Sequence, residues 1–206
     1  MDQSVIEKML STIAGITGKV EGAFNLRQNG QGVERYSTEN VKITAKADRP
    51  GIDILVRPGT KGESVHIPVI LTESGINDLV YNDFIIGEGA DVTIIAGCGI
   101  HNDGHAKSEH DGIHSFKIGK NAHIRYVEKH YGEGEGTGER ILNPTTLITM
   151  DEGASCEMEM VQIAGVSSTV RKTDATLGKD AKLLITERLM THDKQSAVSD
   201  VVIHLN

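Results

Sequence analysis

Aromatic side chains are scarce in this chain of 206 residues, which holds three Phe, four Tyr and no Trp. A globular domain usually fills its centre with large rings. A chain with so few must fill its core with Val, Ile, Leu, Met and Ala, in a space narrow enough for these side chains to reach across. The composition therefore favours a thin core.

Basic runs, long apolar runs and cysteines are also lacking. With 21 Lys and Arg against 29 Asp and Glu, the net charge is −8, so the chain is a poor candidate for binding nucleic-acid phosphates. No stretch of 18 apolar residues predicts a membrane span, and the segment MDQSVIEKMLSTIAG does not resemble a signal peptide. Two cysteines make no disulfide framework, so we expect a reducing, cytoplasmic location.

One helical pattern opens the chain, and strand patterns follow it. Apolar residues recur with helical spacing within residues 1–20, and the pattern stops at Gly15. Residues 21–40 are polar, with QNGQG as a turn cluster. From residue 41 the period becomes two, in the segments VKITAKA, GIDILVRPG, ESVHIPVILT and DFIIGEGADVTII. We therefore expect a helix over residues 1–20 and one β-domain over residues 21–206.

A weak internal repeat runs through the second half of the chain. Each unit has a strand, a polar turn, an alanine and a second strand, and the alanines are Ala90, Ala122, Ala154 and Ala181. A small residue at a constant corner suits strands that are stacked in register. Residues two and four places after each alanine are expected to face inward. These residues are Val92, Ile94, Ile124, Tyr126, Cys156, Met158, Leu183 and Ile185.

Two architectures fit this repeat, a β-solenoid and a jelly-roll or cupin-like barrel. The solenoid is favoured because its thin core suits stacked aliphatic side chains and explains the scarcity of rings. A barrel made of hairpins would show more Asn-Gly or Asp-Gly pairs at two-residue turns. The sequence therefore predicts an all-β fold, a β-solenoid with a short N-terminal helix.

The stretch from Cys98 to His114 concentrates side chains that bind borderline and soft metals such as zinc and iron. One thiol and four of the nine histidines follow the spacing C-x2-H-x3-H-x4-H-x3-H, at Cys98, His101, His105, His110 and His114. Its glycines would let a loop fold around an ion. We expect a metal or cluster site, with a solvated loop as the alternative. Two interpretations of Cys98 stay open. Neighbouring histidines lower the pKa of its thiol and make it nucleophilic, or the thiol is half-buried and inert.

Other candidate residues carry weaker signals. Cys156 occupies an inward position and is expected to be a small buried hydrophobe. His130 is expected to be solvated, with an approach to the His-rich stretch one layer away as the alternative. The glycine-rich run at residues 132–140 lacks the G-K-[ST] of a P-loop, and its three glutamates would repel phosphate. We expect a mobile loop there and no nucleotide site.

The chain resembles the SufB/SufD family of iron–sulfur cluster assembly proteins, above all its short SufB-like members. The likeness lies in VYNDFIIGEGADVTIIAGCGIHNDGHAKSEHDGIHSFKIGKNAHIRYVEKHYGEGEGTGERILNP, VQIAGVSSTVRKTDATL and ITERLMTHDKQSAVSD, and it covers roughly residues 20–206. This resemblance implies a right-handed parallel β-helix. It also implies a non-enzymatic scaffold that works with a SufC-type ABC ATPase and a sulfur donor protein, and that builds iron–sulfur clusters for transfer.

The resemblance implies roles for single residues as well. Cys98 matches a family cysteine associated with accepting sulfur inside the β-helix. His110 matches a histidine of longer SufB chains, and His130 falls where polar residues are proposed to line a sulfur path. We expect iron at Cys98 and His110 together with three histidines to which the family assigns no role, His101, His105 and His114.

The chain also departs from the family. Family members continue past the final HLN with further strands and a helical domain that docks the ATPase, so the resemblance implies a chain truncated at its C-terminus. A solenoid cut open would expose strand edges and favour a homodimer. Two alternatives stay open beside the scaffold. One is a metal-dependent enzyme on a cupin-like or β-helical frame that uses His101, His105 and His110, and the other is a structural interaction module.

Overall fold

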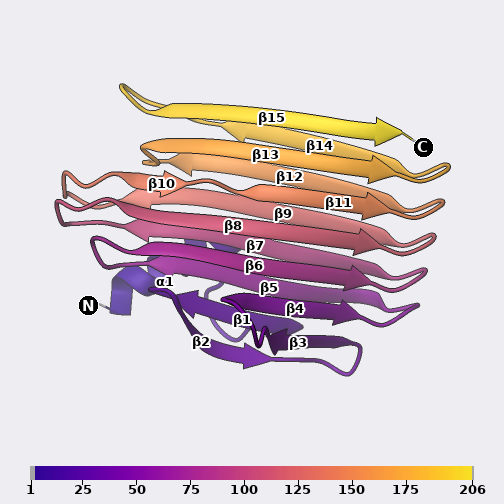
Figure 1. Ribbon diagram of the computed structural model, residues 1–206. Helices are drawn as coiled ribbons and strands as arrows, with labels where there is room; N and C mark the ends of the chain where they lie inside the picture. The colour runs from indigo at the N-terminus through magenta and orange to yellow at the C-terminus, as the bar shows by residue number, and fades with distance from the viewer. Residues whose placement is uncertain (1–2, 206) are drawn as a thin grey trace.

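Two β-sheets face each other across a thin core in the computed structural model, which describes residues 3–205 (Figure 1). The predicted β-solenoid is confirmed, with about 5 turns. The elements are α1 (Gln3–Ala14), β1 (Ala23–Gln28), β2 (Gln31–Tyr36), β3 (Val41–Ala45), β4 (Gly51–Val56), β5 (Lys61–Leu71), β6 (Asn77–Ile86), β7 (Asp91–His101), β8 (Ser108–Ile118), β9 (His123–Glu133), β10 (Arg140–Leu142), β11 (Thr145–Met150), β12 (Ser155–Ala164), β13 (Ser168–Leu177), β14 (Lys182–Leu189) and β15 (Ser196–Leu205).

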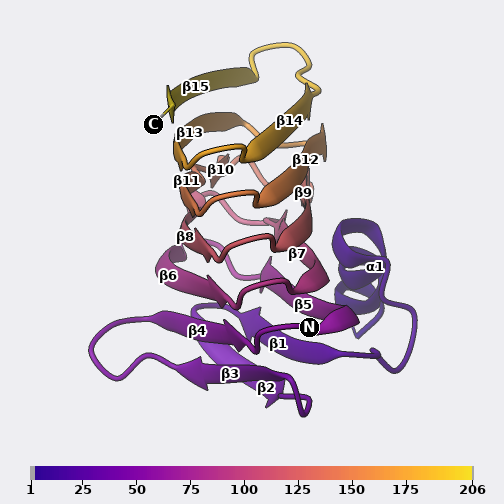
Figure 2. The same ribbon diagram turned by 90° about the vertical axis from the view of Figure 1, so that its right-hand side faces the viewer.

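The chain alternates between the two sheets as it climbs. One sheet has the order β14-β12-β9-β7-β5-β1-β2 and the other β10-β13-β11-β8-β6-β4-β3, with β15 on β13. The pairs β1–β2 and β3–β4 are antiparallel and lie at the base of the stack (Figure 2). The QNGQG cluster forms the β1–β2 turn, where Asn29 and Gly30 both have positive φ, 47° and 79°. This conformation suits a two-residue hairpin loop.

The repeat predicts the apolar part of the core. Ala90, Ala122 and Ala154 are buried at successive corners, and β7, β9 and β12 pair in parallel register, 32 residues apart. Of the residues predicted to face inward, those on these three strands are buried, including Cys156. Leu183 and Ile185 of the top coil are partly buried against the same cluster.

Polar residues occupy further inward positions on β6, β8, β9 and β13. Beyond the apolar half, the buried residues include Asp78, Asn82, His110, His114, Glu128, His130 and Arg171. A second apolar cluster follows, formed by Val69, Leu71, Cys98, Ile100, Leu142 and Val166. The core therefore has a polar stretch between two apolar stretches. This placement matters because buried charges are tolerated only when they are paired and hydrogen-bonded.

The glycine-rich run at residues 132–140, expected to be a mobile loop, is instead a packed corner. Its amides donate to the turn of the coil below, Gly136 N to Asn102 O at 3.1 Å and Gly138 N to Gly104 O at 3.0 Å. A Cβ on Gly136 would lie 2.2 Å from Gly104 O. Glycine is needed here because two backbones approach too closely for any side chain.

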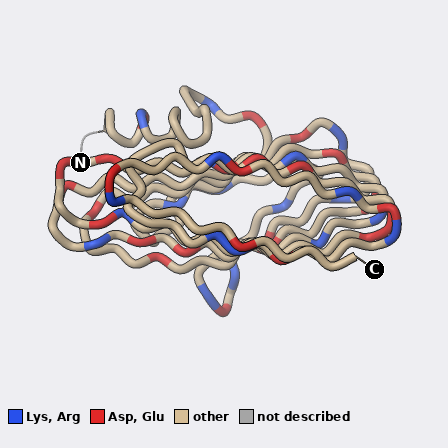
Figure 3. Tube along the Cα trace, turned by 90° about the horizontal axis from the view of Figure 1, so that it is seen from above, with Lys and Arg blue, Asp and Glu red and all other residues tan. Residues whose placement is uncertain are grey.

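Helix α1 lies outside the stack, against one long side (Figures 2 and 3). Its Met9 and Ile13 are fully buried and pack over Gly97 and Gly99 of β7. The helix therefore covers the outer face of the strand whose inner face carries Cys98. No helix within residues 3–205 has the length and apolar character needed to cross a bilayer.

Gly97→Ala is expected to lower the free energy of unfolding by about 1–3 kcal/mol through overpacking. The new Cβ would lie 2.6 Å from the backbone oxygen of Ile13, so α1 itself must shift. Gly99→Ala is the matched control, because its Cβ meets the flexible end of Met9, Cε, at 2.6 Å. Urea unfolding measures both variants. An equal loss in both would show that α1 is not held rigidly at Gly97.

Candidate functional site

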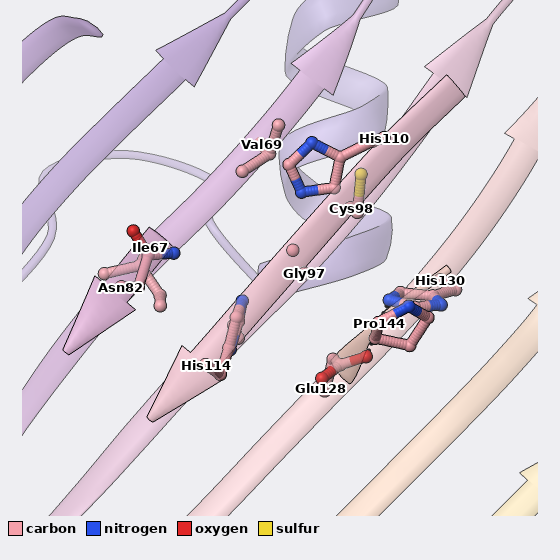
Figure 4. A pocket seen from close by; sticks show the side chains of 12 residues that line it. Ile67, Val69, Asn82, Gly97, Cys98, His110, His114, Glu128, His130 and Pro144 are labelled. Carbon is pink, nitrogen blue, oxygen red and sulfur yellow. Dashed lines mark ion pairs between the residues drawn. The ribbon is translucent and has the colours of Figure 1, made fainter. Parts of the chain in front are cut away.

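A small cavity of about 20 Å³ lies inside the solenoid beside Cys98 (Figure 4). A cavity of this size holds about one water-sized group. Its polar and ionisable lining comes from four strands and consists of Asn82, Cys98, His110, His114, Glu128 and His130. Three of the residues proposed from the Cys98–His114 stretch therefore share one cavity.

The stacking of successive coils places these side chains. On one sheet, Cys98 of β7 pairs in register with Val69 of β5 and His130 of β9. On the facing sheet, two pairs of β6 and β8 residues stack directly, Asp78 with His110 and Asn82 with His114. Each ladder is held by backbone hydrogen bonds, so the side chains of the site project from rigid elements.

His110 links the Cys98 side of the cavity to the ion pair between Asp78 and Arg27, whose side chains are 3% and 14% exposed. His110 and Cys98 both line the cavity, as Figure 4 shows. His110 Nδ1 lies 3.0 Å from Asp78 Oδ2, and Arg27 donates to both Asp78 oxygens, at 2.9 Å from Nε and 2.5 Å from Nη2. Because a carboxylate only accepts, neutral His110 carries its proton on Nδ1 and leaves Nε2 as an acceptor. Burial opposes ionisation of Asp78, but Arg27 and His110 outweigh it and lower the pKa of this carboxyl.

The Cys98 thiol is 3% exposed. Burial raises its pKa well above the ordinary value, and the Asp78 and Glu128 carboxylates raise it further. The idea that nearby histidines lower this pKa is therefore wrong, and the resting group at neutral pH is the thiol. Such a thiol becomes nucleophilic when an adjacent base takes its proton, with a third group orienting that base. Cys98 and His110 line the same cavity, and Asp78 contacts the His110 ring at Nδ1.

A second buried network centres on Glu128. Its Oε1 lies 2.6 Å from His130 Nε2 and 3.1 Å from Arg171 Nη2, and its Oε2 accepts from the Tyr126 hydroxyl at 2.8 Å. Burial favours the neutral acid, but Arg171 and His130 outweigh it and hold the pKa of Glu128 well below its usual range. Burial lowers the pKa of His130, so this ring is neutral and donates from Nε2 while Nδ1 accepts from Arg171 at 3.4 Å.

Two imidazole nitrogens converge over Gly112. A Cβ there would lie 2.9 Å from His114 Nε2 and 3.4 Å from His110 Nε2. Burial lowers the pKa of His114 to about 4, so its ring is neutral. Since Tyr126 gives its proton to Glu128, His114 Nδ1 donates to the Tyr126 oxygen at 2.9 Å. Its Nε2 therefore faces the same small space as His110 Nε2, and both nitrogens can accept.

The other histidines of the stretch lie elsewhere, because β7 runs to His101 and β8 begins at Ser108. His101 faces outward between Asp103 at 2.8 Å and Glu133 at 3.3 Å, and exposed His105 contacts Thr137 at 2.8 Å. The prediction of one loop folded around an ion is therefore wrong, because most of this stretch belongs to strands β7 and β8. Among residues 3–205, no group of three or more His, Cys, Asp or Glu side chains is placed to hold a metal ion.

The expectation of a solvated His130 is also wrong, since its ring is 4% exposed inside the solenoid. Sequence reasoning missed further members of the network, namely the partly buried Arg27 and the buried Asp78, Asn82, Glu128 and Arg171. Asp78, Asn82, Glu128 and Arg171 lie on β6, β9 and β13. The period-two alternation of these strands already indicated that their side chains face inward. The inward series of β9 runs from Ile124 and Tyr126 directly to Glu128 and His130.

Among curated proteins, the chain is similar to a protein of Methanocaldococcus jannaschii that is named an iron–sulfur cluster assembly SufBD family protein. The two are 27% identical over 170 residues, which is 82% of this chain and 50% of the relative. This similarity supports the SufB/SufD family. It suggests iron–sulfur cluster assembly at a distant level, and the chain spans about half the length of the curated relative it matches. No family model and no solved structure matches the chain.

Proposed function

We propose that this chain is a scaffold component of iron–sulfur cluster assembly and that Cys98 accepts the sulfur. The observation that carries the proposal is the Cys98–His110–Asp78 arrangement inside the solenoid. The similarity to a SufBD family protein supports the same chemistry. A buried thiol with a neighbouring imidazole and an orienting carboxylate suits sulfur transfer in a site screened from water.

The proposed step is an exchange between a thiol and a persulfide. His110 Nε2 takes the Cys98 proton, and the thiolate attacks the terminal sulfur of a donor persulfide. A new S–S bond forms on Cys98 as the donor's S–S bond breaks. The inner sulfur of the donor persulfide leaves as a thiolate and takes the proton from His110. The number of S–S bonds is unchanged, so the exchange needs no external oxidant. The cavity of about 20 Å³ offers room for the added sulfur.

Iron enters this proposal as cargo. Imidazole and thiolate are ligands that suit iron, and His110 and His114 turn their Nε2 atoms toward one space beside the Cys98 cavity. We assign iron positioning to these two histidines and leave out His101 and His105, because both lie outside the cavity. The same placement gives no support to a metal-dependent enzyme built on His101, His105 and His110.

The partners are proposed in part from the resemblance. The resemblance to the SufB/SufD family is the basis for proposing a SufC-type ATPase and a sulfur donor protein as partners. It is also the basis for proposing a cytoplasmic location. A homodimer through the open β-helix edge rests on the apolar surface of β15, where five large hydrophobic residues are exposed, namely Val198, Val201, Val202, Ile203 and Leu205. Exposed apolar edge strands favour pairing with another chain.

Cys98→Ser is expected to abolish sulfur acceptance, because serine supplies no sulfur to carry a persulfide. The purified chain is incubated anaerobically with a low-molecular-weight persulfide, and mass spectrometry counts the sulfur atoms gained. Cys156→Ser is the matched control, since Cys156 is also buried and burial raises the pKa of its thiol to about 12, but it is not among the residues that line the Cys98 cavity.

We expect the unchanged chain and Cys156→Ser each to gain one sulfur atom, and Cys98→Ser to gain none. Retention of the added sulfur in Cys98→Ser would overturn the assignment. So would a gain that is lost only in Cys156→Ser. Peptide mapping of the alkylated product locates the modified residue in either case.

A further inference from the structure

A larger cavity, of about 310 Å³, lies at the base of the solenoid. We call it the basal cavity. Its walls come from the β1–β2 hairpin, the β3–β4 hairpin and the first strands of the stack, which Figure 2 shows together at the base. Four cationic side chains line it, Arg27, Arg35, Lys46 and Arg49, and no carboxylate is among its lining residues. This is unusual in a chain whose net charge is −8.

Two of the four cations are neutralised within the protein. Arg27 forms the ion pair with Asp78, and Lys46 is bound by Asp53 and by Asp83, the latter at 2.6 Å. These carboxylates face the cations from outside the cavity lining, so both side chains serve as structural walls. The pairs also hold the hairpins against β6, which carries Asp78 and Asp83.

The other two cations keep their charge available. Arg35 donates to the neutral Asn25 Oδ1 at 2.8 Å, and within residues 3–205 it forms no ion pair. Arg49 lies over the Tyr81 ring, 4.5 Å from the centroid, and its ion-pair partner is the adjacent exposed Asp48 at 3.8 Å. Stacking on a ring fixes the guanidinium plane and leaves its N–H edges free. Among the described residues, the basal cavity therefore has one cation without an ion pair, Arg35, and a second, Arg49, whose only ion pair is with an exposed carboxylate.

We propose that the basal cavity binds a small molecule with an oxoanion group, which Arg35 and Arg49 recognise. Guanidinium groups present paired donors that match the oxygens of carboxylate, phosphate or sulfate. Asn25, Gln31 and Asn82 add amide donors to the same walls. A volume of about 310 Å³ lies at the lower end of the range for small-molecule pockets.

The basal cavity shares part of its wall with the Cys98 cavity. Ile67, Val69 and Asn82 line both. A bound anion would therefore sit one side-chain layer from the thiol site. The proposal does not depend on sulfur acceptance, because Arg35 and Arg49 take no part in the Cys98–His110–Asp78 arrangement.

Calorimetric titration of the full chain tests this proposal, with inorganic phosphate, sulfate and citrate as separate probes at constant ionic strength. We expect saturable binding of one anion per chain. The double variant R35Q/R49Q is expected to bind at least about tenfold more weakly, because each charge-assisted hydrogen bond contributes strongly to affinity. The control is R125Q/R188Q, which removes the same charge from exposed arginines of β9 and β14.

The absence of binding by all three anions would overturn the proposal. Equal weakening in both double variants would also overturn it, since the effect would then come from net charge alone. Tighter citrate binding would assign a carboxylate ligand, and tighter phosphate or sulfate binding a tetrahedral oxoanion. Circular dichroism checks the fold of R35Q/R49Q, and the single variant R49Q, at a side chain that is 44% exposed, replaces it if the double variant unfolds. Anion binding that persists in Cys98→Ser separates this site from sulfur acceptance.

Discussion

Arg171→Met is expected to lower the free energy of unfolding by about 3–5 kcal/mol, because it leaves a buried carboxylate without its cationic partner. The Arg171 and Glu128 side chains are 2% and 3% exposed, and Arg171 also reaches Glu187 at 3.3 Å. Methionine fills much of the same volume and cannot pair with either carboxylate. His130 is the remaining partner of Glu128 Oε1, and a neutral ring does not compensate the charge.

Arg188→Met is the matched control for this variant. Arg188 also pairs with a glutamate, Glu159 at 2.6 Å, but its side chain is 59% exposed. Exposed ion pairs contribute at most about 1 kcal/mol. Urea unfolding with linear extrapolation compares the two variants. Similar losses in both would show that the Glu128 network is not sealed from water.

Combining Arg171→Met with Glu128→Gln is expected to recover part of the loss. The double change removes the stranded charge and keeps an amide whose single oxygen can accept from His130, while its NH2 group lies where the Tyr126 hydroxyl donated. Residues in one buried network are expected to show such non-additive effects. A double variant that is less stable than the sum of the single changes would contradict this account of the network.

The sequence predicts the apolar half of the solenoid because each coil repeats the same local rule. Ala122 marks a corner, Ile124 and Tyr126 face inward, and neighbouring coils supply identical positions 32 residues away. Each of these signals lies within a few neighbouring residues, so a single sequence is sufficient to predict which apolar residues face inward. The few aromatic rings of the core follow the same repeat. Phe84 and Phe116 occupy equivalent positions of adjacent coils and stack directly, with 4.2 Å between their centroids.

The polar half of the core could not be predicted by the same rule. Glu128 and His130 continue the inward alternation, but an isolated charged residue at such a position normally indicates solvent exposure. Their burial depends on Arg171, which is 43 and 41 residues away and projects from the facing sheet. Whether a charge is compensated is decided by pairing between sheets, which no single strand pattern contains.

The Cys98–His114 stretch shows the same limit at the candidate site. Glycines and mixed charges between its histidines predict a loop, whereas the structure forms two strands on facing sheets, which residues 102–107 connect. The glycines have packing roles, since Gly97 and Gly99 admit α1 and Gly112 admits the rings of His110 and His114. Sequence spacing therefore groups five candidate ligands, and the direction of each strand separates His101 and His105 from the others.

Asp78→Asn is expected to slow persulfide formation on Cys98 by roughly 100-fold or more, the scale of a lost general base. The carboxylate holds His110 with its proton on Nδ1, so that Nε2 can take the thiol proton. An asparagine amide can donate to Nδ1 and so favours the tautomer with the proton on Nε2, where no base remains for Cys98. Asp111→Asn, an identical change one residue from His110 on the outward face of β8, is expected to leave the rate within about twofold.

The pH profile separates this positioning role from a general loss of structure. The unchanged chain is expected to react through His110 at neutral pH, while Asp78→Asn must wait for the thiol to ionise unaided. Because burial raises the pKa of Cys98 well above the ordinary value, the rate of the variant should climb only in strongly alkaline solution, and its deficit should shrink there. His110→Gln should show the same alkaline recovery. A rate deficit that is constant with pH, in a variant that is folded by circular dichroism, would remove His110 and Asp78 from the transfer step.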